Sequence, residues 1–309
     1  MSLAFVFPGQ GSQSVGMLGE LAETYPIVKE TYQEASDVLG YDLWKLISEG
    51  PADELNQTHI TQPALLAAGI AVWRVWQEKG GAQPAVLAGH SLGEYTALVA
   101  SGAISFADGI ALVAERGRYM QEAVPAGQGG MAAILGLDDD KVIALCLEAA
   151  QGEVVSAVNF NSPGQVVIAG QATAVDRAIE LAKEAGAKRA LKLAVSAPSH
   201  CALMQPAAER LAEKLASVEI KSPSIPVINN ADVVAATDAD AIRDALVRQL
   251  YSPVRWVESV EKMSADGIER LIECGPGKVL VGLNKRIVKT MSAAAIFDTA
   301  TLDAALADS

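Results

Sequence analysis

A serine between two glycines is the residue best suited to chemistry in this chain. Gly89-His90-Ser91-Leu92-Gly93 fits the pattern G-x-S-x-G, with a strand-like run over residues 85–88 before it and a helical pattern over 91–100 after it. That context predicts a sharp strand-to-helix turn that exposes the serine hydroxyl above the sheet edge. The N–H groups at the start of the helix can then stabilise a developing oxyanion. The motif therefore predicts Ser91 as a nucleophile.

A simpler interpretation of the same serine is helix capping. Ser91-Leu92-Gly93-Glu94 fits the capping box S-x-x-E, in which the serine only binds free N–H groups of the helix. Capping does not explain a glycine on both sides of the serine, so we favour the nucleophile.

A serine nucleophile needs a base, and the chain has 3 histidines. His59 stands in a polar stretch typical of a loop or a helix cap, and a tight turn would direct His90 away from Ser91. His200 lies where a small central domain is expected to return to the larger one, which favours a cleft position. We favour His200 as the base, with an ordinary loop histidine as the alternative; a backbone carbonyl or an amide could orient its ring.

Arg116 is unusual because its position is apolar. It shares one face of the predicted helix 108–124 with Leu112, Val113 and Met120, whereas Arg118 points to the opposite side. A buried guanidinium needs an anion. The alternatives are an ion pair with a distant Asp or Glu, or a fork that binds a substrate carboxylate through two hydrogen bonds.

The glycine-rich loop Phe7-Pro8-Gly9-Gln10-Gly11-Ser12-Gln13 does not match the nucleotide-binding patterns. Gly11 and Gly16 have the Walker spacing but Met17 replaces the lysine, and Ser14 stands where G-x-G-x-x-G requires glycine. Because the loop follows a first strand, it is expected to line the cleft of an open sheet.

Composition limits the classes of function. The chain has 309 residues and a net charge of −13, which argues against nonspecific binding to nucleic acid or to an anionic membrane. The cysteines (Cys146, Cys201 and Cys274) have no C-x-x-C spacing, and no histidine pattern indicates a metal. There is no leader-like basic and apolar N-terminal pattern, and the longest apolar run, Ala64 to Trp73, is too short to span a bilayer. We expect a cytoplasmic monomer that needs no metal or cofactor.

Strands and helices alternate along most of the chain, which predicts an α/β fold with a mostly parallel sheet covered on both faces. Strands are expected at 3–7, 85–88, 226–229 and 270–273. Helices are expected at 18–39, 63–79, 91–100, 108–124, 239–250 and 253–265. Two further helices are expected, one after His200 and one after Gly277.

The middle of the chain has a different order of elements. Strands at 131–135, 154–159, 165–169 and 189–195, with helices at 138–150 and 172–185, give the ferredoxin-like order βαββαβ. We expect a small domain over residues 126–197, inserted into a large domain formed by residues 1–125 and 198–309.

Several motifs together resemble the malonyl-CoA:acyl carrier protein transacylases of bacterial type II fatty acid synthesis. The resemblance covers nearly the whole chain, and its motifs are Phe7 to Gln13, Gly89 to Glu94, Arg116-Gly117, Asn159 to Pro163, Pro198 to His200 and Glu273 to Gly277. It implies an α/β-hydrolase-like large domain with a ferredoxin-like insertion.

The resemblance also implies an activity and roles for individual residues. Malonyl-CoA and acyl carrier protein would be the partners, and Ser91 would carry the malonyl group with His200 as its base. Arg116 would bind the malonyl carboxylate, the N–H groups of Gln10 and Leu92 would form the oxyanion hole, and a main-chain carbonyl at Gln249 would orient the histidine.

Two other functions share some of these features. A serine hydrolase has the same turn, but its acidic residue comes between serine and histidine; here the candidates are Asp108, Asp138 and Asp176 at helix starts or inside the insertion. A non-catalytic module that binds acyl carrier protein would not need Ser91, His200 and Arg116 together.

Charge is unevenly distributed along the chain. Residues 241–290 contain nine Lys or Arg and six Asp or Glu, a local +3, so the remaining 259 residues carry −16. Lys188, Arg189 and Lys192 form a second basic cluster before His200. These cations either form a docking face for an acidic carrier protein, to which Lys285 and Arg286 would contribute, or are scattered solvated charges.

Overall fold

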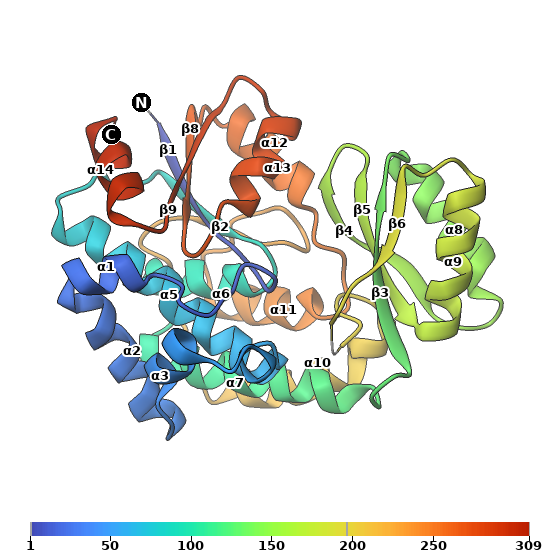
Figure 1. Cartoon of the computed structure of the whole chain (residues 1–309), viewed down its shortest axis with the longest axis horizontal. Helices are drawn as coiled ribbons and strands as arrows, with labels where there is room; N and C mark the ends of the chain where they lie inside the picture. The colour runs from blue at the N-terminus through green and yellow to red at the C-terminus, as the bar shows by residue number, and fades with distance from the viewer. Residues whose placement is uncertain (1, 196, 309) are drawn as a thin grey trace.

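The computed structural model describes residues 2–195 and 197–308, so Met1, Ser196 and Ser309 lie outside the described part of the chain. Two β-sheets stand side by side, each with its own helices (Figure 1). Sheet A has the order β7-β2-β1-β8-β9, and all of its strand pairs are parallel. Its strands are β1 (Leu3–Phe7), β2 (Val86–Gly89), β7 (Val227–Ile228), β8 (Arg270–Cys274) and β9 (Ser292–Ile296). The expected mostly parallel sheet is confirmed.

Strand β1 is central in sheet A and is buried along its whole length. Leu3, Phe5 and Phe7 belong to the core cluster that includes helix α5 (Thr58–Glu78), and the ring of Phe5 packs edge-on against Trp73 and Trp76. Ala4 and Val6 belong to the opposite cluster, under helices α12 (Trp256–Ala265) and α13 (Val279–Ile287). An uninterrupted apolar strand is therefore stable here because both of its faces are covered.

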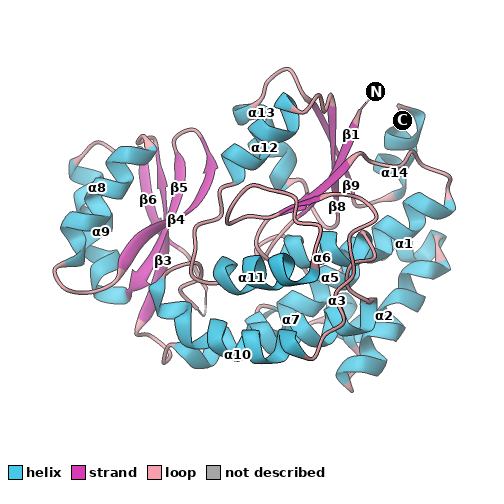
Figure 2. Cartoon of the chain, turned by 180° about the vertical axis from the view of Figure 1, so that it is seen from behind, coloured by secondary structure: helices cyan, strands magenta, loops and turns pink. Residues whose placement is uncertain are grey.

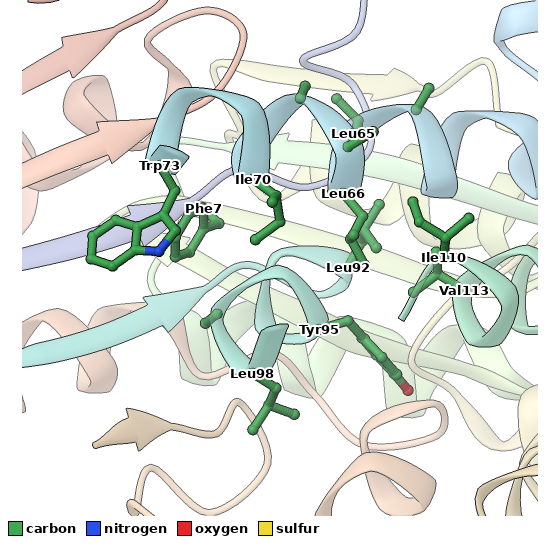
Figure 3. Close-up of a cluster of buried hydrophobic side chains, with 14 of the residues drawn as sticks. Phe7, Leu65, Leu66, Ile70, Trp73, Leu92, Tyr95, Leu98, Ile110 and Val113 are labelled. Carbon is green, nitrogen blue, oxygen red and sulfur yellow. The ribbon is translucent and has the colours of Figure 1, made fainter. Parts of the chain in front are cut away.

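The other helices of the larger layer surround α5 and sheet A, as the view from behind shows (Figure 2). They are α1 (Gly19–Thr24), α2 (Pro26–Leu39), α3 (Leu43–Glu49), α4 (Ala52–Leu55), α6 (Leu92–Ala100), α7 (Phe106–Ala123), the 3₁₀ turn at Ala202–Met204, α10 (Gln205–Ala216), α11 (Ala239–Gln249) and α14 (Thr299–Ala307). Phe7, Leu66 of α5, Leu92 of α6 and Val113 of α7 meet in one buried cluster (Figure 3). This cluster fixes the start of α6, where Ser91 lies, against the sheet.

Sheet B is antiparallel, with the order β4-β5-β3-β6. Its elements follow the chain as β3 (Gly129–Leu135), α8 (Asp139–Ala150), β4 (Val155–Ser162), β5 (Gln165–Gln171), α9 (Ala172–Glu184) and β6 (Arg189–Lys192). This βαββαβ order with β5 and β3 in the centre is ferredoxin-like, as expected, and it has its own apolar core against α8 and α9.

Sheet B is joined to the larger layer by backbone hydrogen bonds. Val254, between α11 and α12, donates its N–H to Val158 O at 2.8 Å and accepts from Phe160 N at 3.0 Å, both on β4. The contact continues strand pairing across the boundary, so β4 is held beside the loops of sheet A. The proposed domain limits at residues 126 and 197 stay a prediction.

Some predicted elements differ from those observed. The single helix expected at 18–39 is two helices, because Tyr25 before Pro26 has an extended backbone with φ −120° and ψ 103°. Helix α5 begins at Thr58 rather than at Pro63, which lies inside it. The side chain of Gln121 accepts the N–H of His59 at 3.1 Å, so a neighbouring helix satisfies a free amide of the added turn. Helices α3, α4 and α14 and strand β9 were not expected.

Two glycines allow helix α6 to cross close to the ends of β1 and β2. A Cβ on Gly93 would lie 2.0 Å from Phe7 O, and one on Gly89 would lie 1.9 Å from the carbonyl carbon of Gly93. Both neighbours are backbone atoms in the centre of the fold, so they cannot move aside independently. The glycines of G-x-S-x-G are thus required by packing.

We expect Gly93→Ala to lower the free energy of unfolding by roughly 1–3 kcal/mol through overpacking. Gly282→Ala is the control, because Gly282 is an exposed glycine of α13 with no atom within 4 Å of an added Cβ. It should stabilise the protein by about 0.5–1 kcal/mol, since alanine favours a helix. Urea unfolding measures both; equal stability of the two variants would contradict this account.

Candidate active site

Ser91 occupies a strained turn between β2 and α6. Its backbone has φ 52° and ψ −106°, and its side chain makes no capping hydrogen bond. The Ser91 N–H donates to Asn230 Oδ1 at 2.7 Å rather than to Glu94, so the capping-box interpretation is wrong. A non-glycine residue with positive φ is costly, and such strain is typical of functional positions.

The structure brings Ser91 and His200 into direct contact although 109 positions separate them. Ser91 Oγ lies 2.7 Å from His200 Nε2, and His200 Nδ1 lies 2.7 Å from the main-chain carbonyl oxygen of Gln249. A carbonyl can only accept, so Nδ1 carries the proton and Nε2 has a free lone pair that accepts from the serine hydroxyl. This is the tautomer a general base requires.

The surroundings of His200 favour its neutral form. Burial is the larger cause and the positive charge of Arg116 the next, and together they lower the pKa of His200 to about 3, although the hydrogen bond to Gln249 opposes this shift. The side chain is therefore uncharged at neutral pH and able to accept a proton. Its backbone has φ 65°, and its N–H donates to Leu250 O at 2.9 Å, so the strained position is anchored.

Arg116 is 1% exposed and points at the serine. Its Nη2 donates to Ser91 Oγ at 3.3 Å and to Gln249 Oε1 at 3.0 Å, and its Nη1 donates to Gln62 Oε1 at 2.8 Å. Among the residues that the structure describes, it forms no ion pair and its Nε has no acceptor. The alternative of a structural ion pair is wrong, because amide oxygens and the ring of Tyr95, 5.1 Å from the guanidinium carbon, surround the charge.

A close contact between α5 and α7 sets the position of Arg116. A Cβ on the next residue, Gly117, would lie 2.6 Å from the Cα of His59, so only glycine lets the helices approach this far. The approach brings Gln62 of α5 within hydrogen-bonding distance of the guanidinium. The sequence Arg116-Gly117 therefore acts as a unit, with one residue carrying the charge and the next allowing its placement.

Gln10 and Leu92 lie at the same end of sheet A as the serine. Both line one cavity with Ser91, and within residues 2–195 and 197–308 no hydrogen bond from either backbone N–H is seen. Gln10 follows β1, and its side chain donates to Thr58 Oγ1 at 3.2 Å. The two N–H groups are thus available to a ligand, and their role as an oxyanion hole stays a prediction.

The cavity has a volume of about 480 Å³, within the usual range for small-molecule sites. Gln10, Ser91, Arg116 and His200 line it from the larger layer. Sheet B and the segment after it close the opposite side with Met131, Ala133, Asn159, Asn161, Gln165, Val167, Leu193, Ala194 and Val195. A site between two layers matches the cleft predicted for His200.

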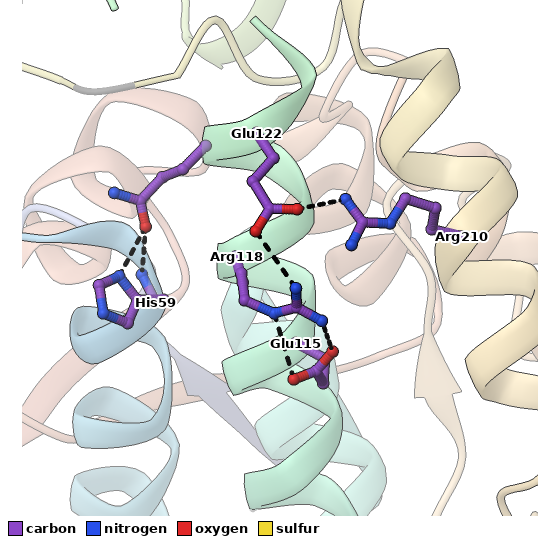
Figure 4. A network of polar contacts seen from close by, with 6 residues as sticks. His59, Glu115, Arg118, Glu122 and Arg210 are labelled. Atoms are coloured by element: carbon purple, nitrogen blue, oxygen red, sulfur yellow. Dashed lines mark hydrogen bonds and ion pairs between the residues drawn. The ribbon is translucent and has the colours of Figure 1, made fainter. Parts of the chain in front are cut away.

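The other two histidines do not contact the serine through any hydrogen bond described. His90 Nε2 lies 2.7 Å from Asn161 Oδ1 on β4, and its ring packs on Trp256. His59 lies in the first turn of α5, not in a loop, and its Nδ1 lies 2.7 Å from Gln121 Oε1 (Figure 4). Arg118 pairs with Glu115 and Glu122 on the outside of α7, which confirms that it points away from Arg116 (Figure 4).

Four residues of the site were not anticipated: Gln62, Glu94, Tyr95 and Asn230. Gln62 and Tyr95 lie within helical patterns that look like ordinary core, and their contacts depend on how α5, α6 and α7 pack. Asn230 could have been found, because it follows a parallel strand and such strand ends meet at one edge of a sheet. The sequence signals Glu94 only through the pattern S-x-x-E, which indicates a capping residue.

No helix in the described part of the chain combines the length and the apolar character needed to cross a membrane. Cys146, Cys201 and Cys274 are buried and form no disulfide.

Comparison with known proteins now identifies the family. The model of the acyl transferase domain matches residues 4–303. The chain belongs to this family. A malonyl CoA-acyl carrier protein transacylase from Salmonella typhimurium is 64% identical over 98% of both chains. The resemblance drawn from the motifs is confirmed.

Solved structures agree with this assignment. An acyl carrier protein S-malonyltransferase from Vibrio cholerae is 66% identical, with a TM-score of 0.96 over 98% of this chain and 99% of that one. A malonyl-transacylase solved in complex with a type II polyketide synthase acyl carrier protein is 60% identical, with a TM-score of 0.99 over the full length of both chains. The fold class expected from the sequence is confirmed by these structures.

We expect the reactivity of Ser91 to be independent of pH between about 5 and 8. Because burial and Arg116 hold the pKa of His200 near 3, lowering the pH through 6.5 should not protonate the base. Arg116→Ala should raise that pKa and bring the loss of reactivity to a higher pH. The rate of Ser91 labelling by a serine-directed sulfonyl fluoride measures both; a wild-type midpoint near 6.5 would contradict the account.

Proposed function

We propose that this protein transfers a malonyl group from malonyl-CoA to the phosphopantetheine thiol of acyl carrier protein through a malonyl-serine intermediate, supplying fatty acid elongation. The observation that carries the proposal is a buried arginine beside the serine and its base that has no carboxylate partner within residues 2–195 and 197–308. Arg116 and Ser91 Oγ are 3.3 Å apart, so a carboxylate bound by the guanidinium belongs to a short acyl group on that serine.

The first step acylates the serine. His200 Nε2 accepts the proton of Ser91 Oγ as this oxygen attacks the thioester carbonyl, and the N–H groups of Gln10 and Leu92 stabilise the oxyanion. The carbon–sulfur bond then breaks, and the CoA thiol leaves with the proton from His200. The carbonyl of Gln249 holds the imidazole ring throughout, in the role that a carboxylate has in many serine hydrolases.

The second step reverses these roles. The thiol of acyl carrier protein gives its proton to His200 and attacks the malonyl-serine ester. The ester bond breaks, Ser91 Oγ recovers the proton and the malonyl thioester of the carrier leaves. One serine thus serves two thiols in turn, which is a ping-pong mechanism.

A serine hydrolase is the main alternative, and the surroundings of His200 argue against it. None of the three acidic residues considered contacts the histidine. Asp108 lies in the first turn of α7 and accepts from Ser105 Oγ, Asp138 precedes α8, and Asp176 pairs with Lys192. A carrier-binding module without catalysis would leave the Ser91–His200 contact unexplained.

We further propose that the protein is a cytoplasmic monomer. Its catalytic domain would comprise residues 1–125 and 198–309, with the insertion at 126–197.

The test is mass spectrometry of the protein after mixing with malonyl-CoA and then with acyl carrier protein. We expect one malonyl adduct on Ser91 that the carrier removes, and none in Ser91→Ala.

Arg116→Ala should lower malonyl transfer while sparing or raising acetyl transfer, since groups that hydrogen-bond a substrate can discriminate between substrates by about 10⁴.

Arg118→Ala is the matched control, because this arginine lies on the same helix but outside the site. Rapid release of free malonate would favour the hydrolase, and absence of any adduct would favour the binding module. Equal losses of malonyl and acetyl transfer in Arg116→Ala would contradict the role given to the arginine.

A basic surface near the cavity suits the carrier protein as a partner. Of the nine cations in residues 241–290, Arg243, Arg248, Arg255, Lys262 and Arg270 pair with acidic residues. The exposed side chains of Lys278, Lys285, Arg286 and Lys289 form no ion pair with any residue the structure describes. Arg286 donates to Gln165 Oε1 at 2.9 Å, and Gln165 lines the cavity, so this surface adjoins its mouth.

We expect the double substitution Lys285→Ala with Arg286→Ala to raise the KM for acyl carrier protein more than it changes the hydrolysis of a small thioester. The physical reason is loss of electrostatic attraction to an acidic partner, so the effect should shrink at high salt. Lys45→Ala with Lys214→Ala removes the same charge from α3 and α10, which do not line the cavity, and should have little effect. An unchanged ratio of the two activities would remove the docking proposal.

A further inference from the structure

Asn230 binds both sides of the strained turn that carries the nucleophile. Its Oδ1 accepts the N–H of Ser91 at 2.7 Å, and its Nδ2 donates to the carbonyl of Gly89 at 2.7 Å. Asn230 itself is 1% exposed and follows β7, the edge strand beside β2. One amide side chain therefore connects the residues before and after His90 in a conformation that the backbone would not keep unaided.

Glu94 holds Asn230 and the catalytic-site glutamine together. Its Oε2 accepts the backbone N–H of Asn230 at 2.8 Å and the side-chain Nε2 of Gln249 at 2.8 Å. The same Nε2 also donates to the carbonyl of Ser91 at 3.0 Å. One carboxylate oxygen thus connects the serine turn with the residue whose main-chain carbonyl orients His200.

This arrangement also decides which N–H groups can serve the oxyanion. The Ser91 N–H is occupied by Asn230, whereas no hydrogen bond from the Leu92 N–H is seen in the part of the chain that the structure describes. The asparagine fixes the turn from the side of β7 and leaves the first free amide of α6 to the reaction.

We propose that Asn230 and Glu94 are positioning residues that align Ser91 with His200 by holding the serine turn and Gln249 in one hydrogen-bonded network. The inference rests on the proposed function. Neither side chain lines the cavity among the described residues, so both act through Ser91 and Gln249 rather than by contact with substrate.

The first comparison uses asparagines that are neighbours in the chain. Asn230→Ala removes both contacts to the turn, and a misplacement of about 1 Å can lower a rate by roughly 10²-fold. We expect a loss of that order in kcat for malonyl transfer with an unchanged KM for malonyl-CoA. Asn229→Ala is the control, because the Asn229 side chain is also buried but accepts the N–H of Asp232 instead; it should keep its kcat.

The second comparison separates alignment from simple loss of packing. Glu94→Ala should lose activity like Asn230→Ala, whereas Glu94→Gln keeps an oxygen that can accept both N–H groups and should stay within a few-fold of wild type. Asn230→Asp has about the same size as asparagine, and as a carboxylate it still accepts from Ser91 but has no hydrogen to donate to Gly89. The kcat of Asn230→Asp for malonyl transfer should be at least tenfold lower than that of wild type. This variant replaces Asn230→Ala in the comparison if Asn230→Ala does not fold.

Labelling of Ser91 by a sulfonyl fluoride gives a readout that does not need malonyl-CoA. Folded Asn230→Ala, Asn230→Asp and Glu94→Ala proteins should label slowly, in parallel with their kcat, and Glu94→Gln should label within a few-fold of wild type. Arg116→Ala should still label while losing malonyl transfer. A folded Asn230→Asp or Glu94→Ala protein with wild-type labelling and kcat would overturn the inference, as would an equal loss in Asn229→Ala. Absence of a malonyl adduct in the wild type, with normal labelling, would instead refute the proposed function.

Discussion

The hydrogen bond between Ser91 Oγ and His200 Nε2 is the interaction on which the rest of the site depends. Both residues have positive φ, at 52° and 65°, and neither conformation is favourable for an isolated chain. The fold keeps them in place by bonding their backbones to distant residues: Ser91 to Asn230, and His200 to Leu250. The edge where the parallel strands end is therefore a rigid support for two strained residues.

Burial of a positive charge is the second constraint. Arg116 is held by Gln62 and Gln249 through their neutral oxygens, so the guanidinium is positioned but its charge is not cancelled. That charge helps to keep His200 neutral, and it leaves the site ready for a carboxylate. Burial also raises the pKa of Glu94 to about 7, so this nearby carboxyl is a weaker anion than an exposed one. The buried charge of Arg116 thus contributes both to the choice of a substrate with a carboxylate and to the neutral state of His200.

Local patterns in the sequence predicted the parts of this site that depend on local structure. The glycines around Ser91 indicate that helix α6 crosses close to the strand ends, because only local geometry and one neighbouring strand are involved. The apolar spacing around Arg116 places this residue on a buried helix face. The order of elements 126–197 predicts the ferredoxin-like unit because each strand and helix has its own periodicity. The roles of Ser91, His200, Arg116, Gln10, Leu92 and Gln249 stay predictions that agree with the observed geometry.

What the sequence did not predict depends on contacts between distant elements. The start of α5 before Pro63 is stabilised by Gln121 of α7, and no local pattern signals that contact. Gln62 looks like an ordinary buried helical residue until Gly117 brings the two helices together. Asn230 becomes part of the site only once β7 is placed beside β2. In each case the deciding partner is far away in the chain.

The most direct test of the account is ¹⁵N NMR of the His200 imidazole over the pH range from about 5 to 8. The account predicts a neutral ring with its proton on Nδ1 throughout, since burial and Arg116 lower the pKa to about 3 and the Gln249 carbonyl selects this tautomer. Comparison with a His200→Gln sample assigns the signals. An imidazolium that titrates near 6.5, or a proton on Nε2, would contradict the account.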